Sequence, residues 1–132
     1  MSTTSTLPTN ATHVVDRYIA VWNETDPKRR RDLIEQTWTD DATYLDPLMA
    51  GEGADGIDAM IAGVQQQFPG YRFRLLGEVD HHHDRVRFSW ELAPGDGQPA
   101  PVAGTDFGTL APDGRLQSVT GFLDRMPGPA EG

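Results

Sequence analysis

The chain has 132 residues and a formal net charge of −9, with 11 Lys and Arg against 20 Asp and Glu. This length predicts one domain with one core, and the acidic balance argues against nucleic acid and anionic membrane surfaces as partners. The absence of cysteine excludes disulfides, thiolate zinc sites and cysteine nucleophiles. No apolar run approaches the roughly 20 residues of a membrane span, and the first residues lack a basic and then apolar leader pattern, so we expect a cytoplasmic protein.

The first residues are polar and predict a disordered tail over residues 1–11. A helix is expected to begin between Thr9 and Thr12, where several side chains could cap it. Tyr18 lies in the middle of its apolar stripe, so the hydroxyl either bonds a backbone carbonyl in the core or donates into a cavity. The stripe consists of Val14, Val15, Tyr18, Ile19, Val21 and Trp22.

Asp26 and Pro27 predict the start of a second helix, with an Asp cap and a proline in the first turn. The basic run 28–31 opposes the dipole at that helix start, which favours a solvated face. The inner face of this helix is expected to carry Leu33, Ile34, Thr37 and Trp38.

The stretch Asp40–Pro47 reads as a short strand leaving this helix. Side chains alternate along a strand, so Tyr44 and Asp46 share one face and Leu45 takes the other. Pro47 cannot donate to a sheet, and pairing should fail there. Asp46 then lies at a strand end beside apolar residues, where a partly desolvated carboxylate can transfer protons. The alternative is an ordinary turn-forming Asp before proline.

Glycines in the segment 51–56 predict a flexible connector, and Asp55 is a candidate cap for a third helix that ends at Pro69–Gly70. The apolar positions of that helix keep a helical period: Ile57, Met60, Ile61, Val64 and Phe68. From Tyr71 the period changes to two, which predicts strands over 71–76 and 85–92. Between them, His81, His82 and His83 favour a turn over a metal site, because alternate side chains of an extended segment point apart.

The segment Pro94–Pro101 is expected to be a long hairpin loop, followed by a strand over 102–110. On that strand Asp106 shares its face with Gly104 and Gly108, which leaves room for a ligand or another chain. Without further information, a solvent-facing Asp near a sheet edge is favoured. A final strand is expected over 116–126, followed by a disordered tail over 127–132.

Three helices followed by antiparallel strands predict an α+β fold. The expected shape is a cone, with the three N-terminal helices packed on a curved, mainly antiparallel sheet around an apolar cavity. Such a concave site is the default place for a ligand.

Three stretches carry a family resemblance over residues 12–126. The chain resembles the SnoaL-like group of the nuclear-transport-factor-two-like superfamily, and its acidic positions resemble those of ketosteroid isomerase. The stretch 17–23 is similar to the isomerase's first helix, whose tyrosine is an oxyanion donor, and 40–47 to the segment that carries its catalytic base. The stretch 105–107 lies where that enzyme has a second oxyanion donor, a protonated aspartic acid.

The resemblance implies that Asp46 abstracts a proton beside a carbonyl, while Tyr18 and neutral Asp106 donate hydrogen bonds to the enolate oxygen. It implies no cofactor and no metal, a hydrophobic small molecule as substrate, and a homodimer through the sheet. The reaction would be isomerase-like or polyketide cyclase-like. We expect the substrate pocket to be lined by Trp22, Trp38, Tyr44, Met60, Phe68 and Trp90.

Two other functions remain open. A binding module would use the same cavity without catalysis, because a fold does not choose an activity. An interaction domain would pair two chains through the open sheet face, where residues 71–92 alternate charged and aromatic side chains.

Overall fold

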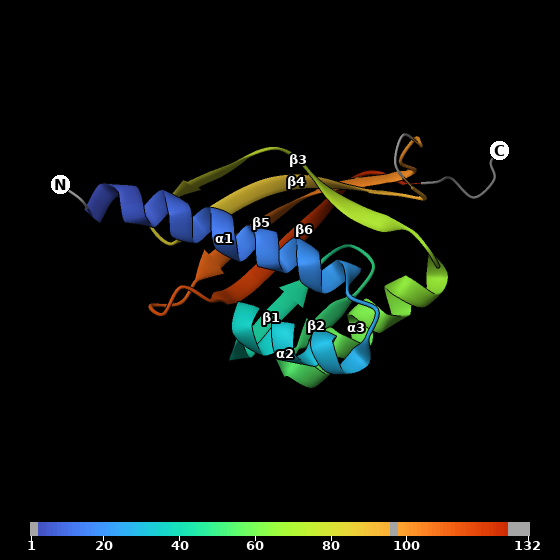
Figure 1. Cartoon of the computed structure of the whole chain (residues 1–132), viewed down its shortest axis with the longest axis horizontal. Helices are drawn as coiled ribbons and strands as arrows, with labels where there is room; N and C mark the ends of the chain where they lie inside the picture. The colour runs from blue at the N-terminus through green and yellow to red at the C-terminus, as the bar shows by residue number, and fades with distance from the viewer. Residues whose placement is uncertain (1–2, 96–97, 127–132) are drawn as a thin grey trace.

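The computed structural model describes residues 3–95 and 98–126. Its elements confirm the predicted α+β class, with the helices early in the chain and most strands after them (Figure 1). The elements are α1 Thr3–Asn23, α2 Pro27–Thr37, β1 Trp38–Leu45, β2 Ala50–Glu52, α3 Gly53–Gln67, β3 Arg72–His82, β4 Arg85–Ala93, β5 Val102–Leu110 and β6 Leu116–Arg125. The predicted tail 127–132 lies outside the described residues.

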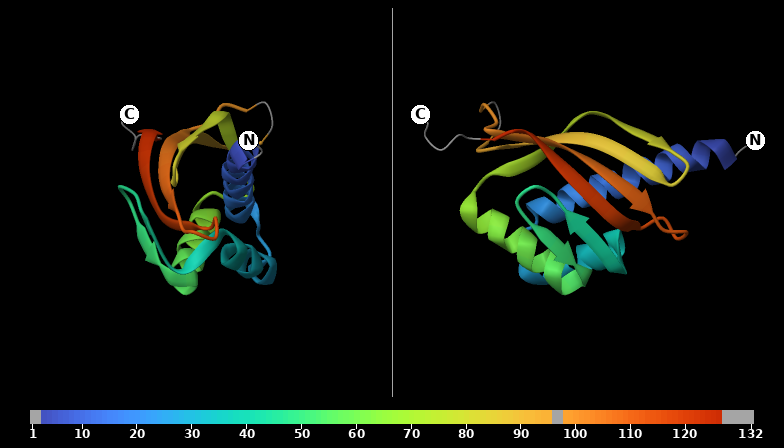
Figure 2. Two further views of the ribbon diagram at one scale, coloured as in Figure 1. Left: turned by 90° about the vertical axis from the view of Figure 1, so that its left-hand side faces the viewer. Right: turned by 180° about the vertical axis from the view of Figure 1, so that it is seen from behind.

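The strands form one mixed sheet in the order β2-β1-β6-β5-β4-β3. Neighbouring strands are antiparallel except β1 and β6, which run parallel with Thr43 opposite Ser118. The sheet curves, and all three helices lie on the same side of it (Figure 2). Its inner face and the helices enclose the core, whose largest fully buried side chains include Tyr18, Trp38 and Phe88.

Helix α1 begins at Thr3, earlier than the start predicted between Thr9 and Thr12. The helix runs through Pro8, which has no backbone N–H and therefore makes no i to i−4 hydrogen bond at that position. The predicted stripe is confirmed farther along, where Val14, Tyr18 and Trp22 are at most 4% exposed. This stripe attaches α1 to the sheet, most extensively at β3.

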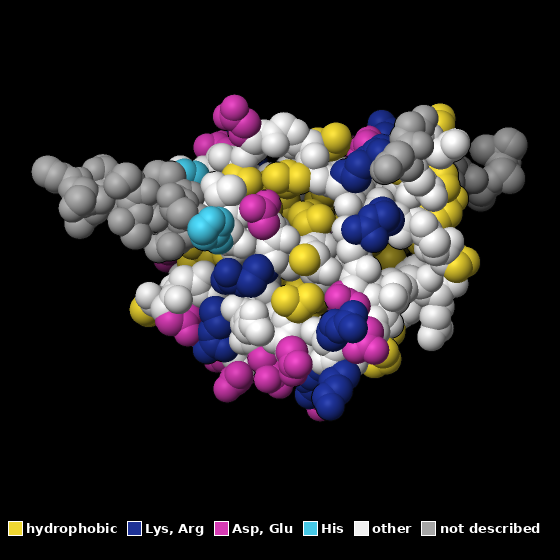
Figure 3. Space-filling view, viewed as in Figure 1, with side chains coloured by type: hydrophobic (Ala, Val, Ile, Leu, Met, Phe, Trp, Pro, Cys, Tyr) yellow, Lys and Arg dark blue, Asp and Glu magenta, His cyan; other side chains and the backbone are white. Residues whose placement is uncertain are grey.

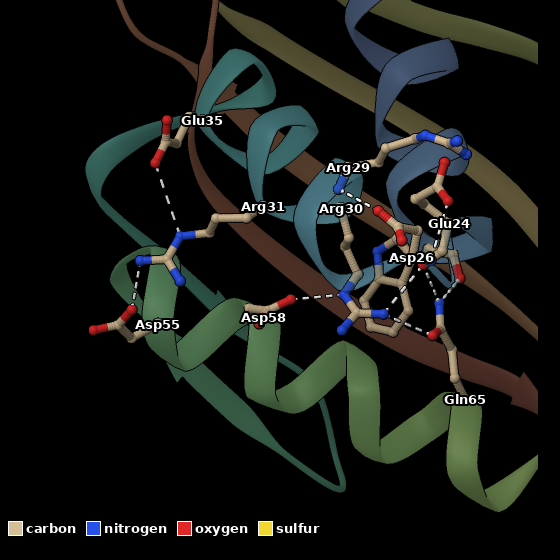
Figure 4. Close-up of polar contacts among 10 residues, drawn as sticks. Glu24, Asp26, Arg29, Arg30, Arg31, Glu35, Asp55, Asp58 and Gln65 are labelled. Atoms are coloured by element: carbon tan, nitrogen blue, oxygen red, sulfur yellow. Dashed lines mark hydrogen bonds and ion pairs between the residues drawn. The ribbon is translucent and has the colours of Figure 1, made fainter.

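Helix α2 starts as predicted, because the Asp26 carboxylate accepts a hydrogen bond of 2.9 Å from the Arg29 amide. The prediction of a solvated basic face is wrong for Arg30, because this residue is only 5% exposed. The Arg30 guanidinium donates to Asp58 at 2.6 Å and to Gln65 at 2.9 Å (Figure 4). Partners on α3 thus replace the water that a charged side chain otherwise needs.

The glycine-rich segment is not a flexible connector, because Ala50–Glu52 forms strand β2 and α3 begins at Gly53. Gly53 has φ 70°, in the left-handed region that glycine enters at little cost. A Cβ on Gly51 would lie 3.1 Å from the Gly56 carbonyl oxygen, so the strand passes close to the first turn of α3. Asp55 does not cap α3; its carboxylate accepts a hydrogen bond of 2.5 Å from Arg31.

Strand β3 continues through His81 and His82, so the turn before β4 is limited to His83 and Asp84. In the part of the chain that the structure describes, no three His, Cys, Asp or Glu side chains are grouped as metal ligands. The helices within residues 3–95 and 98–126 include none that is long and apolar enough to cross a membrane. Acidic and basic side chains are interspersed on the face shown in Figure 3.

Candidate active site in a pocket of the inner sheet face

A pocket of about 210 Å³ lies between the inner face of the sheet and helices α1 and α3. Its walls are mainly apolar. They include Ile19, Val64, Phe68, Phe73, Leu92 and Leu123. Two tyrosines, two aspartates and one tryptophan bring polar groups into the same pocket: Tyr18, Tyr44, Asp46, Trp90 and Asp106. Convergent polar groups in an apolar concavity are typical of a ligand site.

The inner polar pair consists of Tyr18 and Asp106. The Tyr18 hydroxyl donates to Asp106 Oδ2 at 2.5 Å, and the Trp90 indole N–H donates to Oδ1 at 3.0 Å. Asp106 is only 2% exposed. The expectation of a solvent-facing Asp near an edge is therefore wrong, because β5 lies between β4 and β6 and Asp106 points to the inner face.

Burial raises the pKa of Asp106 from 3.8 to about 6. The hydrogen bonds from Tyr18 and Trp90 oppose this rise, because they stabilise the carboxylate, while the negative charges of Asp46 and Asp124 add to it. Burial first, and then the charge of Asp106, also raise the pKa of Tyr18 well above its usual value. Tyr18 therefore remains a hydrogen-bond donor throughout the neutral range.

The outer polar pair consists of Tyr44 and Asp46. Tyr44 lies on β1 and lines the pocket, and its hydroxyl donates to Asp46 Oδ2 at 2.6 Å. The chain turns at Pro47, so Asp46 Oδ1 accepts the backbone N–H groups of Leu48 at 2.8 Å and Met49 at 3.0 Å. The end of β1 thus points the Asp46 side chain toward Tyr44, and the turn that follows supplies two backbone N–H donors to its carboxylate.

The two pairs meet above Gly121 on β6. A Cβ on Gly121 would lie 2.8 Å from Asp106 Oδ1, 3.2 Å from the Tyr44 hydroxyl oxygen and 3.3 Å from Asp46 Cβ. The missing side chain therefore provides the space in which both pairs converge. Burial and the charge of Asp106 raise the pKa of Tyr44 far above its usual value, so this hydroxyl also stays protonated.

The structure places most of the predicted site residues in the pocket. Tyr18, Asp46 and Asp106 line it together with four predicted wall residues, Trp22, Tyr44, Phe68 and Trp90. Their roles in catalysis or binding stay predictions.

Trp38 and Met60 are not among the residues that line the pocket. Trp38 is 1% exposed and packs against the Tyr18 ring at a centroid distance of 5.3 Å, so it supports Tyr18 within the core. Met60 is buried in the core on α3. Sequence reasoning missed the wall residues Phe73, Leu92 and Leu123, although the two-residue period of their strands places Phe73 and Leu92 on the inner face.

The comparisons with known proteins agree with this architecture. Residues 15–119 match the model of the SnoaL-like domain family. A proposed isomerase of the SnoaL-like family from Agrobacterium tumefaciens strain C58 is 46% identical, with 88% of this chain and 98% of that chain covered and a TM-score of 0.82. A comparison with curated proteins finds no match.

More distant structures share the fold. A proposed SnoaL-like polyketide cyclase from Jannaschia sp. CCS1 is 24% identical over 89% of this chain and 87% of that chain, with a TM-score of 0.70. An NTF2-like protein of unknown function from Exiguobacterium sp. 255-15 is 23% identical over 84% of this chain and 98% of that chain, with a TM-score of 0.67. With the family match over most of its length and a close structural relative, the chain belongs to the SnoaL-like domain family.

Proposed function

We propose that the chain is a cofactor-independent acid/base enzyme that transfers a proton in a small hydrophobic carbonyl compound through an enolate. One observation carries the proposal: Tyr18, Asp46 and Asp106, which are far apart in the sequence, line one mainly apolar pocket. The similarity to a proposed isomerase supports the same class of reaction.

In the proposed reaction, Asp46 takes a proton from the carbon beside the carbonyl. The C–H electron pair moves into the enolate, whose negative charge collects on the oxygen. Tyr18 and protonated Asp106 donate hydrogen bonds to that oxygen, which lowers the barrier because the bonds strengthen as the charge develops. Asp46 then returns the proton to another carbon of the enolate. Where the enolate carbon instead attacks a second carbonyl of the substrate, the C=O π bond opens and Asp46 returns the proton to the alkoxide that forms.

The protonated form of Asp106 is accessible because its pKa is about 6. Tyr18 and Trp90 hold this carboxylate in the free site. An oxyanion arriving beside Asp106 places a like charge next to it and favours proton uptake. Binding of the developing enolate and protonation of Asp106 are therefore coupled in this mechanism.

The proposed substrate is small. The pocket volume of about 210 Å³ lies below the ~300–1,000 Å³ of common ligand pockets. We assign the pocket to the inside of a cone, with the polar groups at one end. The aromatic wall of Trp22, Phe73 and Trp90 would surround the rings of a cyclic substrate. One or two fused rings suit this space.

The test is deuterium exchange at the α-carbons of 2-tetralone in D₂O, followed by proton NMR, since this readout does not depend on the later steps. The exchange rate should fall by about 10²–10⁴-fold in Asp46→Asn. The control is Asp41→Asn, which makes the same change at an exposed position of β1. Equal exchange by Asp46→Asn and wild type, with normal circular dichroism for both, would refute the proposal.

A binding module is the second candidate, because Tyr18 and Asp106 already satisfy each other without a ligand. Titration with phenols of graded acidity, which mimic the enolate, separates the two functions. Binding that weakens in Asp106→Asn supports the oxyanion site, whereas phenol binding without any α-exchange supports binding alone.

We also propose a homodimer through the outer face of the sheet, which is compatible with either function. Phe107 and Phe122 are 40% and 57% exposed there, on the neighbouring strands β5 and β6. Light scattering at micromolar concentration should give twice the chain mass; a monomeric mass would contradict this arrangement.

A further inference from the structure

We infer that Tyr44 is a positioning residue for Asp46: its hydroxyl binds one carboxylate oxygen and fixes which oxygen receives the proton. The inference rests on the proposed function, in which Asp46 is the base. It assigns to Tyr44 a role beyond that of a pocket wall.

The hydrogen bonds of Asp46 distinguish its two oxygens. Among residues 3–95 and 98–126, Oδ1 accepts two backbone N–H groups, from Leu48 and Met49, whereas Oδ2 accepts the Tyr44 hydroxyl alone. A carboxylate oxygen has two lone pairs, so Oδ1 is fully occupied and Oδ2 keeps one for the proton. The structure thus selects Oδ2 as the basic atom, and Tyr44 orients it.

Tyr44 is itself held firmly, which positioning requires. Its side chain is 4% exposed, and its ring packs against Trp22 at a centroid distance of 5.7 Å. Its backbone pairs with Gly51 on β2 and Val119 on β6. The hydroxyl therefore approaches Asp46 from a strand that is paired on both sides.

The charges around Asp46 show why such a donor matters. The titratable groups that face it in the pocket are Tyr44 from β1, Tyr18 from α1 and Asp106 from β5. The other pocket-lining side chains from α3, β3, β4, β5 and β6 carry no charge, and within the described residues no Lys, Arg or His lines the pocket. Neutral donors are therefore the available means of stabilising the Asp46 carboxylate.

The two tyrosine–aspartate pairs consequently divide the work. Asp106 is desolvated, which favours its protonated form, whereas Asp46 accepts three hydrogen bonds, which orient its carboxylate. Removing the Tyr44 hydroxyl leaves the orientation of Asp46 to the two backbone N–H groups alone.

The experiment compares Tyr→Phe changes at two of the three tyrosines of the chain. Tyr44→Phe removes the hydroxyl that contacts Asp46, and Tyr71→Phe is the matched control, since Tyr71 is half-buried and does not line the pocket. For 2-tetralone exchange, we expect kcat to fall about tenfold in Tyr44→Phe. KM should stay within about twofold, because the hydroxyl bonds the base and not the substrate.

A second readout needs no turnover. The carboxyl ¹³C resonance of Asp46, assigned by comparison with Asp46→Asn, should shift in Tyr44→Phe, because Oδ2 loses its hydrogen bond, and should stay unchanged in Tyr71→Phe. An unchanged resonance in Tyr44→Phe would overturn the inference even if this variant were less active. If wild type shows no exchange, the proposed function fails, while a resonance that shifts in Tyr44→Phe still establishes that the Tyr44 hydroxyl binds the Asp46 carboxylate.

Discussion

Two polar clusters lie inside this small domain, and they compensate their charges in different ways. The Arg30 cluster joins α2 and α3 to the segment that follows α1: the Arg30 guanidinium donates to Asp58, Gln65 and the Glu24 carbonyl (Figure 4). The pocket cluster joins α1, β1 and β5 through two tyrosine–aspartate pairs. In the Arg30 cluster, opposite charges form a salt bridge. In the pocket cluster, two acidic side chains accept hydrogen bonds from neutral donors.

The difference indicates which cluster stabilises the fold and which is available for chemistry. Arg30 does not line the pocket, and its guanidinium forms a salt bridge of 2.6 Å with Asp58. Asp46 and Asp106 line a pocket of about 210 Å³ in which the described residues include no Lys, Arg or His. Like charges without a counterion are a cost to folding that function can explain.

The largest effect that would test this comparison is on stability. Arg30→Met should lower the free energy of unfolding by about 3 kcal/mol, because it leaves Asp58 and two acceptors without their partner. Arg31→Met, at a side chain 40% exposed, should cost at most about 1 kcal/mol. Urea unfolding measures both. A loss no larger than that of Arg31→Met would show that the Arg30 cluster is not structural.

The second largest expected effect is a pH dependence of the free energy of unfolding that Asp106 causes. Its folded pKa of about 6 exceeds the ordinary 3.8, so the folded state binds the proton more tightly, and stability falls as pH rises from about 4 to about 6. A rise of about two units corresponds to about 2–3 kcal/mol. Unfolding curves of Asp106→Asn should lack this step, and curves for the two proteins that stay parallel across this range would contradict the assigned pKa.

The smallest expected effects come from adding a methyl group at two glycines, one beside the pocket cluster and one on the surface of α3. Gly121→Ala should impair α-exchange, because its Cβ would meet Asp106 Oδ1 at 2.8 Å. Gly63→Ala on α3 has open space around the new Cβ and should raise stability by about 0.5–1 kcal/mol with exchange unchanged. Thermal unfolding and exchange rates give both outcomes, and full exchange by Gly121→Ala would mean that the two pairs tolerate separation.

Local patterns in the sequence predicted much of the fold and part of the site. Helical and two-residue periods located the strands and the buried stripe of α1, and strand alternation placed Tyr44 and Asp46 on one face, where they bond. The burial of Arg30 was missed because it depends on α3 packing across α2. The local pattern did not predict the burial of Asp106, because strand order, which puts β5 inside the sheet, is not encoded in such a pattern; only the family resemblance assigned Asp106 to the site.

The parallel pairing of β1 with β6 has a consequence for how the protein forms. Thr43 pairs with Ser118, so this contact closes a long loop and is expected to form slowly compared with the hairpins β3–β4 and β4–β5. Before β6 docks, β1 and β2 are separated from the other three strands, with Asp46 on one part and Asp106 on the other. Since β6 alone joins these two parts of the sheet, we expect the repulsion between the two acids to arise mainly in the step that completes the sheet.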